Sequence, residues 1–281
     1  MKHVYLNGKF YEPAKAKVSV FDKGFNFGGG LYEVIRAYNG RAFFPELHYA
    51  RLMKGASVTG LKIDFSLEGL LKIFEKLSAD GKYKDGIFYL QVTFGAETFR
   101  NNELKPNLSP TVLISYQKSP GIPPAWKQKG IKIKTQKDSR WGHCSVKSIN
   151  LLPNLIDLNH ARNTGYADVL YFNRGRVMEC ASCNIFFILQ GKVITPKKSK
   201  RILPGITRHL VLELLNSLKI PHLERTFSLS ELGDCEGAFV SSTTKGIIPV
   251  CSIDDLFFRK NKLSLKLHTE FEKFRQDYFK T

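Results

Sequence analysis

The sequence predicts a two-domain α+β protein, because strand-like and helical segments are mixed along its length and a stretch rich in proline and glycine divides it. In this stretch, Ser119-Pro120-Gly121-Ile122-Pro123-Pro124, regular structure is disfavoured. The 281 residues, 43% of them hydrophobic, are enough to bury two cores. We therefore expect a smaller N-terminal α+β domain over residues 1–118, a linker over 119–125 and a larger C-terminal α+β domain over 126–281.

The N-terminal domain is expected to contain a hairpin, further strands and two helices. The Asn7-Gly8 pair is typical of a hairpin turn, and Asn39-Gly40 turns the chain again after an alternating strand over 31–38. Apolar residues at helical spacing predict two helices, over 45–60 and 67–79. Continuous apolar runs predict two buried strands, over 87–93 and 111–116.

The C-terminal domain is expected to mix strands with two main helices. One helix is predicted over 151–163, where Gly165 ends the pattern, and one over 207–218, where the apolar residues form a stripe. Apolar runs between turn signals predict strands over 130–135, 169–172, 184–189, 192–195 and 237–240.

The formal net charge of +18 is the unusual bulk property of the chain. Clustered Lys and Arg can bind nucleic acid, but here they are scattered, and no zinc-finger, basic-zipper or RNA-recognition signature accompanies them. We therefore expect a solvated basic surface that attracts small anions, and no nucleic-acid partner.

The sequence also favours a cytoplasmic protein without a membrane partner. No run of about eighteen uncharged apolar residues occurs, and the Asn7-Gly8 turn comes before a signal-peptide core could form. The five cysteines are odd in number and lack a regular framework, which is typical of free thiols in a reducing compartment.

One lysine is a candidate nucleophile. Lys147 lies at the start of an apolar segment that leads into the helix predicted over 151–163. Desolvation beside an apolar wall would lower the pKa of its amine and suit it to condense with an aldehyde. An ordinary surface lysine is the plainer interpretation of the local sequence.

A candidate carboxylate stands in Val177-Met178-Glu179-Cys180-Ala181-Ser182-Cys183-Asn184. Glu179 ends a predicted strand, and the small residues after it would let the backbone approach a flat ligand. A carboxylate there could keep a pyridine nitrogen protonated, although a tight bend with an exposed glutamate explains the pattern equally well. Cys180 and Cys183 form a C-x-x-C pair, but no second pair lies at the usual spacing, so we expect neither a metal site nor thiol redox chemistry.

Two segments are suited to a phosphate group. In Leu203-Pro204-Gly205-Ile206-Thr207-Arg208 a helix begins, and the free N–H groups of a helix start attract anions. Ser242, Thr243 and Thr244 add clustered hydroxyl groups after a strand. Ordinary helix capping remains the alternative for either segment by itself.

The joint order of these motifs resembles the class IV aminotransferases, the fold-type IV pyridoxal-phosphate enzymes, over nearly the whole chain. The matching segments are Phe27-Gly28-Gly29-Gly30-Leu31-Tyr32-Glu33-Val34, His48-Tyr49-Ala50-Arg51-Leu52, Arg140-Trp141, Lys147-Ser148-Ile149-Asn150-Leu151-Leu152, Glu179 with Asn184, Gly205-Ile206-Thr207-Arg208 and Ser242-Thr243-Thr244. The resemblance implies a two-domain fold-type IV enzyme like the D-amino-acid aminotransferases, which works as a homodimer with active sites near the subunit interface.

The resemblance also implies the roles of the coenzyme residues. Lys147 would hold pyridoxal 5'-phosphate as a Schiff base, and Glu179 would pair with the pyridine nitrogen. The phosphate would bind to Arg51, Ile206, Thr207 and Thr243, and Leu203 would pack against the ring.

The substrate residues implied by the resemblance are Tyr32, Val34, Arg36, Arg100 and Thr244. Residues 32, 34 and 36 share one face of their strand because side chains alternate along a strand. Arg100 falls where the D-amino-acid enzymes have an arginine that binds the substrate carboxylate, a task suited to the guanidinium fork.

The sequence leaves the substrate and the reaction open within the family. Arg36-Ala37-Tyr38 resembles the branched-chain aminotransferases, and Glu179-Cys180 also occurs in aminodeoxychorismate lyases. We expect a transaminase that moves the amino group of an aliphatic or small neutral amino acid, either a D-amino acid or a branched-chain L-amino acid, to a 2-oxo acid. A pyruvate-releasing lyase is the alternative, and a non-catalytic basic binding protein is a remote one.

Overall fold

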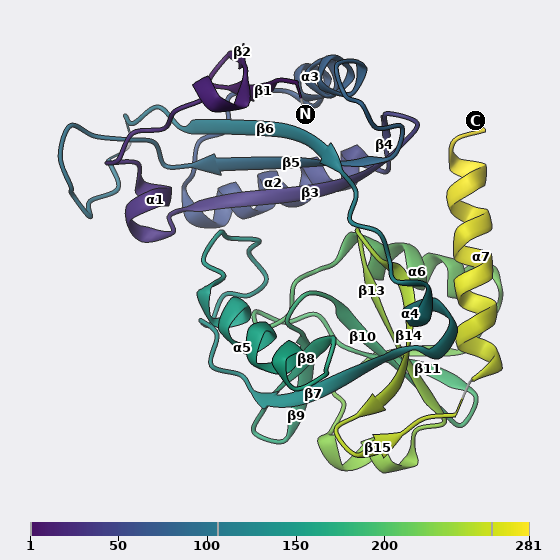
Figure 1. Ribbon diagram of the computed structural model, residues 1–281. Coiled ribbons are helices and arrows are strands. Elements are labelled where there is room, and N and C mark those ends of the chain that lie inside the picture. Colours follow the sequence, from purple (N-terminus) through teal and green to yellow (C-terminus); the bar gives the residue numbers. More distant parts are fainter. Residues whose placement is uncertain (1, 106, 260, 281) are drawn as a thin grey trace. The chain divides into compact units, whose positions relative to one another are not determined.

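The computed structural model describes residues 2–105, 107–259 and 261–280, which form two compact units (Figure 1). The first unit contains the chain up to Pro120 together with Val146–Leu151. The second contains Gly121–Ser145 and the chain from Leu152 onward. No helix among these described residues is long and apolar enough to cross a membrane.

The first unit is built on an antiparallel six-stranded sheet in the order β2-β1-β6-β5-β3-β4. Its strands are β1 (Val4–Leu6), β2 (Lys9–Tyr11), β3 (Gly30–Tyr38), β4 (Arg41–Ala42), β5 (Gly86–Thr93) and β6 (Thr111–Lys118). Its helices are η1 (Pro13–Lys15), α1 (Lys23–Phe27), α2 (Pro45–Thr59) and α3 (Leu67–Ala79). Figure 1 shows α2 running along the sheet.

The core of the first unit lies between this sheet and the helices α2 and α3. Leu31 and Ile35 of β3 are buried there with Leu52 of α2 and Phe74 of α3. Since side chains alternate along β3, its other face carries the partly exposed residues 32, 34 and 36. The alternation of this one strand therefore separates the core from a candidate binding face.

The second unit is built on a mixed nine-stranded sheet in the order β12-β11-β10-β13-β14-β7-β8-β9, with β15 paired to β14. Its strands are β7 (Ile131–Lys137), β8 (Asp168–Asn173), β9 (Arg176–Cys180), β10 (Asn184–Leu189), β11 (Lys192–Pro196), β12 (His222–Arg225), β13 (Gly237–Ser242), β14 (Gly246–Ile253) and β15 (Leu256–Phe257). The pairs β7–β8, β7–β14 and β11–β12 are parallel, and the other pairs are antiparallel.

The helices of the second unit are α4 (Pro124–Lys129), α5 (Leu152–Asn163), α6 (Ile206–Ser217), η2 (Leu229–Asp234) and α7 (Lys262–Tyr278). The apolar stripe predicted for residues 207–218 is buried as the inner face of α6, where Val211 and Leu215 are inaccessible to solvent. Figure 1 shows α7 beside α6 and β14, and Leu267 and Phe271 are its buried anchors.

The α+β class is confirmed, and each strand and helix predicted above has a counterpart in the structure within a few residues. The predicted domain limits remain a proposal, and the structure differs from them in two details. Pro124 and Ala125, expected in the linker, begin α4, because a proline is tolerated in the first turn of a helix. Val146–Leu151, expected in the C-terminal domain, packs with the first unit.

Candidate active site

Lys147 lies on a short segment that runs beside the first residues of β3. The backbone N–H of Tyr32 donates to the carbonyl of Lys147, and the N–H of Ile149 donates to the carbonyl of Gly30, both at 3.0 Å. A side chain at position 30 would be blocked, since its Cβ would lie 2.7 Å from the carbonyl oxygen of Val92. The pairing brings the amine Nζ of Lys147 to 4.1 Å from the centre of the Tyr32 ring. The candidate nucleophile therefore stands beside an aromatic wall.

Behind Tyr32, on the core face of β3, Glu33 is the centre of a buried ionic network. Its carboxylate accepts hydrogen bonds from Nε and Nη2 of Arg51 at 2.8 and 2.7 Å and contacts Nδ1 of His48 at 2.7 Å. Burial alone would raise the pKa of Glu33, but attraction and hydrogen bonds from Arg51 and His48 lower it to about 2. Burial lowers the pKa of His48. The network thus fixes the Arg51 guanidinium next to an ionised carboxylate.

The opposite face of β3 presents the residues expected to meet the substrate. The rings of Tyr32 and Tyr89 lie 5.9 Å apart, and burial raises the pKa of Tyr89 to about 12. The guanidinium of Arg36 lies 4.9 Å from the Tyr38 ring, and its Nε is buried without a hydrogen-bond partner among the described residues. An N–H group in that state is suited to an acceptor brought by a ligand.

Arg100 lies in the loop between β5 and β6, and α1 holds this loop. The guanidinium stacks 4.8 Å from the ring of Phe27. Four residues earlier, the buried Lys23 donates from Nζ to Glu97 at 2.7 Å and to the backbone carbonyl of Asn101. Hydrogen bonds from Lys105 and Lys23 lower the pKa of Glu97 to about 2. The Arg100 loop is therefore tied down on both sides of the arginine.

In the second unit, Glu179 near the end of β9 forms the centre of another buried network. Its Oε1 accepts from Nη1 of Arg140 at 2.8 Å, and its Oε2 accepts from Nδ2 of Asn184 at 3.1 Å and from the backbone N–H of Leu203 at 3.0 Å. Asp138 holds the arginine in turn, through Nε at 3.0 Å and Nη2 at 3.2 Å. Burial raises the pKa of Glu179 to about 7, against the attraction of Arg140.

Asn184 connects this carboxylate to the start of α6. Its amide donates to the carbonyl of Leu203 at 3.1 Å, and a Cβ at position 205 would lie 2.0 Å from its Oδ1. Only glycine fits there, so the chain passes close to Asn184 as it enters the helix. No side chain caps α6, which leaves the N–H groups of its first turn available.

Hydroxyl groups from a neighbouring strand lie on the same side of the sheet edge. Asn184 of β10 pairs with Ser241 of β13, and β13 ends at Ser242 before a turn that contains Thr243 and Thr244. The hydroxyl of Ser242 is buried without a partner among the described residues. An uncapped helix start, an unpaired hydroxyl and a buried carboxylate fit a ligand that carries a phosphate and a protonatable ring nitrogen.

Within its own unit, the structure brings most predicted site residues together. The first unit gathers Lys147, Tyr32, Val34, Arg36, Arg51 and Arg100, and the second gathers Glu179, Leu203, Ile206, Thr207, Thr243 and Thr244. The roles of these residues remain proposals. The sequence argument did not assign roles to Glu33, His48, Asp138, Arg140 and Asn184, which hold the others. A charged residue on the core face of an alternating strand, as Glu33 is, could have indicated the first network.

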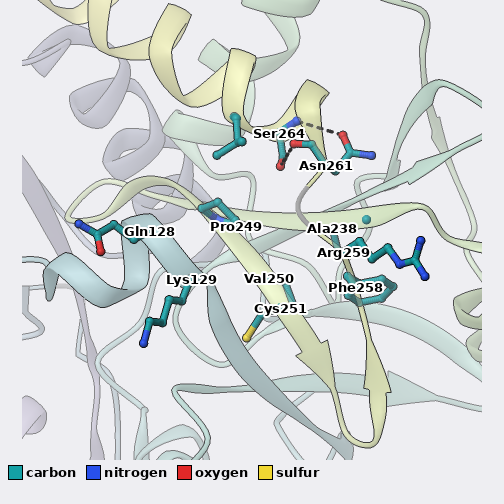
Figure 2. A pocket seen from close by; sticks show the side chains of 12 residues that line it. Gln128, Lys129, Ala238, Pro249, Val250, Cys251, Phe258, Arg259, Asn261 and Ser264 are labelled. Atoms are coloured by element: carbon teal, nitrogen blue, oxygen red, sulfur yellow. Dashed lines mark hydrogen bonds between the residues drawn. The ribbon is translucent and has the colours of Figure 1, made fainter.

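A separate hollow in the second unit contains none of the predicted residues. Figure 2 shows it between α4, β14 and the start of α7, with Gln128, Lys129, Cys251 and Arg259 on its walls. The side chain of Asn261 accepts from the N–H groups of Leu263 and Ser264, so this helix start is already capped. The hollow is therefore less suited to a phosphate than the start of α6.

Comparisons with known proteins agree with these two sets of residues. The family described as amino-transferase class IV matches residues 30–253. The chain is 32% identical to the D-alanine aminotransferase of Staphylococcus aureus (strain MSSA476) over 281 residues, which cover 99% of each chain.

Two solved structures share the fold. The branched-chain amino acid aminotransferase of Escherichia coli superposes with a TM-score of 0.89 at 21% identity, over 97% of this chain and 94% of that one. A second branched-chain amino acid aminotransferase, that of T.th., in complex with N-(5'-phosphopyridoxyl)-L-glutamate, superposes with a TM-score of 0.88 at 22% identity, over 98% and 94%.

Proposed function

Because the chain belongs to the class IV aminotransferase family, we propose that it transfers the amino group of a small neutral D-amino acid, D-alanine in the first place, to a 2-oxo acid. The chain is a pyridoxal-phosphate-dependent transaminase. When bound, the coenzyme supplies an electron sink for bond breaking at the α carbon of the amino acid. The D-alanine aminotransferase from Staphylococcus aureus supports the choice of donor.

The observation that carries the proposal is the Glu179 network. A carboxylate that is buried, fixed by Arg140 and Asn184 and shifted to a pKa of about 7 can hold a proton shared with a ring nitrogen. A purely structural glutamate would gain little from such burial. We assign this carboxylate to the pyridine nitrogen of the coenzyme, with Leu203 against the ring.

The start of α6 would hold the phosphate group. Ile206 and Thr207 offer the first N–H groups of the uncapped helix, and the hydroxyls of Ser242 and Thr243 stand at the end of the neighbouring strand. The positive end of the helix dipole favours a dianion there. Arg51 would add a fixed positive charge, which Glu33 orients.

Lys147 would provide the amine that attaches to the coenzyme and then moves the proton at the α carbon. Tyr32 supports this role, because its ring stands 4.1 Å from Nζ and limits the directions that the amine can take.

The substrate would be recognised by charge at one end and by a small apolar wall at the other. Arg100 and Arg36 are two arginines suited to a carboxylate. Tyr32 and Val34 lie on the same face of β3 and suit an uncharged side chain of modest size. Thr244, in the turn after β13, would contribute a further hydroxyl. A branched-chain L-amino acid is the second donor to test, because Arg36-Ala37-Tyr38 resembles the branched-chain enzymes.

A two-substrate assay with Lys147→Ala as the control tests the proposal. The purified protein is incubated with D-alanine or L-leucine and 2-oxoglutarate, and the keto and amino products are measured. We expect pyruvate and glutamate from D-alanine, and none from the variant. Borohydride reduction followed by peptide mapping should place the coenzyme label on Lys147. Label on another lysine would contradict the assignment, and pyruvate release from aminodeoxychorismate without transamination would establish a lyase instead.

We further propose a cytoplasmic homodimer in which the Arg100 loop closes the pocket of the neighbouring subunit. The apolar face of α5 supports an interface, since Leu152, Leu155 and Ile156 are exposed by 65, 60 and 46%. All five cysteines are free thiols, which supports a reducing compartment.

A further inference from the structure

The turn that joins β9 to β10 carries two thiols beside a buried carboxylate. The backbone N–H of Cys180 donates to the carbonyl of Cys183 at 2.8 Å, so the two residues face each other across a tight turn. Asp168 at the start of β8 is fully buried next to them, and Sγ of Cys183 lies 3.3 Å from its Oδ2. The ligand atoms of these three residues all lie within 4.8 Å of one another.

We propose that Asp168, Cys180 and Cys183 form a binding site for one divalent cation of the zinc class. Two thiolates and one carboxylate are ligands that Zn²⁺ accepts, and three protein ligands leave one tetrahedral position for water. Zn–S bonds of about 2.3 Å place tetrahedral ligand atoms roughly 3.8 Å apart, so the side chains need to close by no more than about 1 Å. The proposal goes beyond transamination and does not depend on the assigned substrate.

The charges around the site match this exchange. Nζ of Lys245 donates to Oδ2 of Asp168 at 3.3 Å and to the Ser182 hydroxyl at 2.8 Å, so carboxylate and ammonium already form a neutral pair. On binding, two S–H bonds break, two metal–sulfur bonds form, and two protons leave for the solvent. One double positive charge replaces two single ones, and the net charge of the buried site stays unchanged. The cost of burying an unpaired charge therefore does not arise.

The carboxylate is held as a ligand would be. Its Oδ1 accepts from the backbone N–H groups of Val169 at 2.9 Å and Ser182 at 3.3 Å, while Lys245 and the Ser182 hydroxyl bond to Oδ2. Partners that fix a ligating group in this way commonly support metal sites. From the sequence the pair of cysteines lacked further ligands at the usual spacing. The missing ligand comes from β8, whose Leu170 pairs with Cys180.

The site is directly connected to the coenzyme carboxylate. Cys180 follows Glu179 and Cys183 precedes Asn184, and these two neighbours share the 3.1 Å hydrogen bond between Nδ2 of Asn184 and Oε2 of Glu179. A bound cation would fix the turn from which both side chains project. We therefore expect metal loading to raise the melting temperature of the coenzyme-bound enzyme.

Titration of the reduced, chelator-treated holoenzyme with Cd²⁺ alone tests the site. We expect one Cd²⁺ per chain, with ultraviolet charge-transfer absorption from thiolate to metal, two protons released per ion and displacement by Zn²⁺. Cys180→Ser and Cys183→Ser should each lose this absorption, whereas Cys235→Ser and Cys251→Ser, the matched controls, should keep it. Lys245→Met should weaken binding by about tenfold or more.

Three outcomes would overturn the site. They are charge-transfer absorption that survives in the Cys180→Ser, Cys183→Ser double variant, binding without proton release, and no binding by the wild-type protein. If the variants do not fold, alkylation of the wild-type protein decides. Zn²⁺ should protect two of the five thiols, Cys180 and Cys183, and a chelator should remove the protection. Protection of other thiols, or protection that persists after chelation as a disulfide would, contradicts the proposal.

Discussion

Arg140 and Glu179 form a buried ion pair in which Nη1 of the arginine lies 2.8 Å from Oε1 of the glutamate. Burial nevertheless raises the pKa of the glutamate to about 7, because desolvation outweighs the attraction of the arginine. At neutral pH the group thus stands between its charged and neutral forms. A protonated ring nitrogen beside it would favour the charged form.

Replacement of Glu179 by glutamine should slow turnover while the coenzyme stays bound. The neutral amide no longer favours a protonated ring nitrogen, and the loss of a charge-assisted hydrogen bond of about 2 kcal/mol corresponds to roughly thirtyfold in rate. Steady-state kinetics and the coenzyme absorption spectrum are the measurements. Glu213→Gln on the exposed side of α6 is the matched control and should behave as the wild type. Unchanged turnover together with an unchanged spectrum would count against the role of Glu179.

The same substitution should change how the stability of the coenzyme-free protein depends on pH. The pKa of Glu179 in the folded protein, about 7, is above its ordinary value of 4.5, so the folded state holds this proton more tightly than the unfolded state. The free energy of unfolding contributed by this group is therefore greatest below about pH 4.5 and falls as the pH rises to about 7. The fall is at most about 1.4 kcal/mol per pH unit.

Urea unfolding of wild type and Glu179→Gln across this range checks the sign. The lowered pKa of His48 acts in the opposite direction, but both proteins contain it, so the difference between them isolates Glu179. Parallel pH profiles would show that Glu179 does not titrate in this window.

Arg100→Ala should raise the Michaelis constant for D-alanine by about thirtyfold, the equivalent of about 2 kcal/mol for a lost charge-assisted pair. The coenzyme spectrum should stay normal, because Arg100 lies in the loop before β6 and is not assigned to the coenzyme. Lys62→Ala on the exposed surface serves as the control. If the Michaelis constant is unchanged in Arg100→Ala and raised in Arg36→Ala, the carboxylate binds to Arg36 instead.

Gly205→Ala should weaken coenzyme binding and destabilise the protein by about 1–3 kcal/mol. The added Cβ would lie 2.0 Å from Oδ1 of Asn184, so the amide that supports Glu179 must move. The φ angle of −64° is allowed for alanine, and the effect is therefore steric. Thermal melting and coenzyme dissociation measure it, with Gly233→Ala, where a Cβ meets no atom within 4 Å, as the control. Equal stability of the two variants would exclude the close approach.

Leu155→Glu should convert the proposed homodimer to a monomer. The side chain is 60% exposed on the apolar face of α5, and a charge buried in an interface is strongly unfavourable. Sedimentation velocity gives the oligomeric state. Leu223→Glu on β12, where the leucine is 48% exposed, should leave it unchanged. A dimeric Leu155→Glu variant, or a wild-type monomer with full activity, would refute the interface.

The fold was largely predictable because its elements have regular hydrophobic periods. The alternation in β3 placed Tyr32, Val34 and Arg36 on one face, and the structure has the same division. The helix α7 was not predicted, since most of its residues are polar and it is anchored mainly by Leu267 and Phe271. Such a narrow stripe becomes evident only when β14 lies against it.

The candidate site was less predictable, because its residues meet through tertiary contacts. Lys147 could be recognised only by family resemblance, since its position beside Tyr32 depends on the pairing of its segment with β3. Arg140 and Glu179 are far apart in the chain, and no local pattern indicates their ion pair. The sequence supplied the chemical types of these residues, and the sheets supply their distances.

The segment Val146–Leu151 has a consequence for protein synthesis. The chain leaves the first unit after Pro120, contributes to the second, returns for these six residues and then leaves again. A ribosome that has released only the first 120 residues has therefore not yet released a complete first unit, and the carbonyl of Gly30 still lacks its partner at Ile149. Folding of the N-terminal sheet can be completed only after residue 151 has emerged. Expression of residues 1–120 as a separate fragment should accordingly give a less stable product than the same sheet in the full chain.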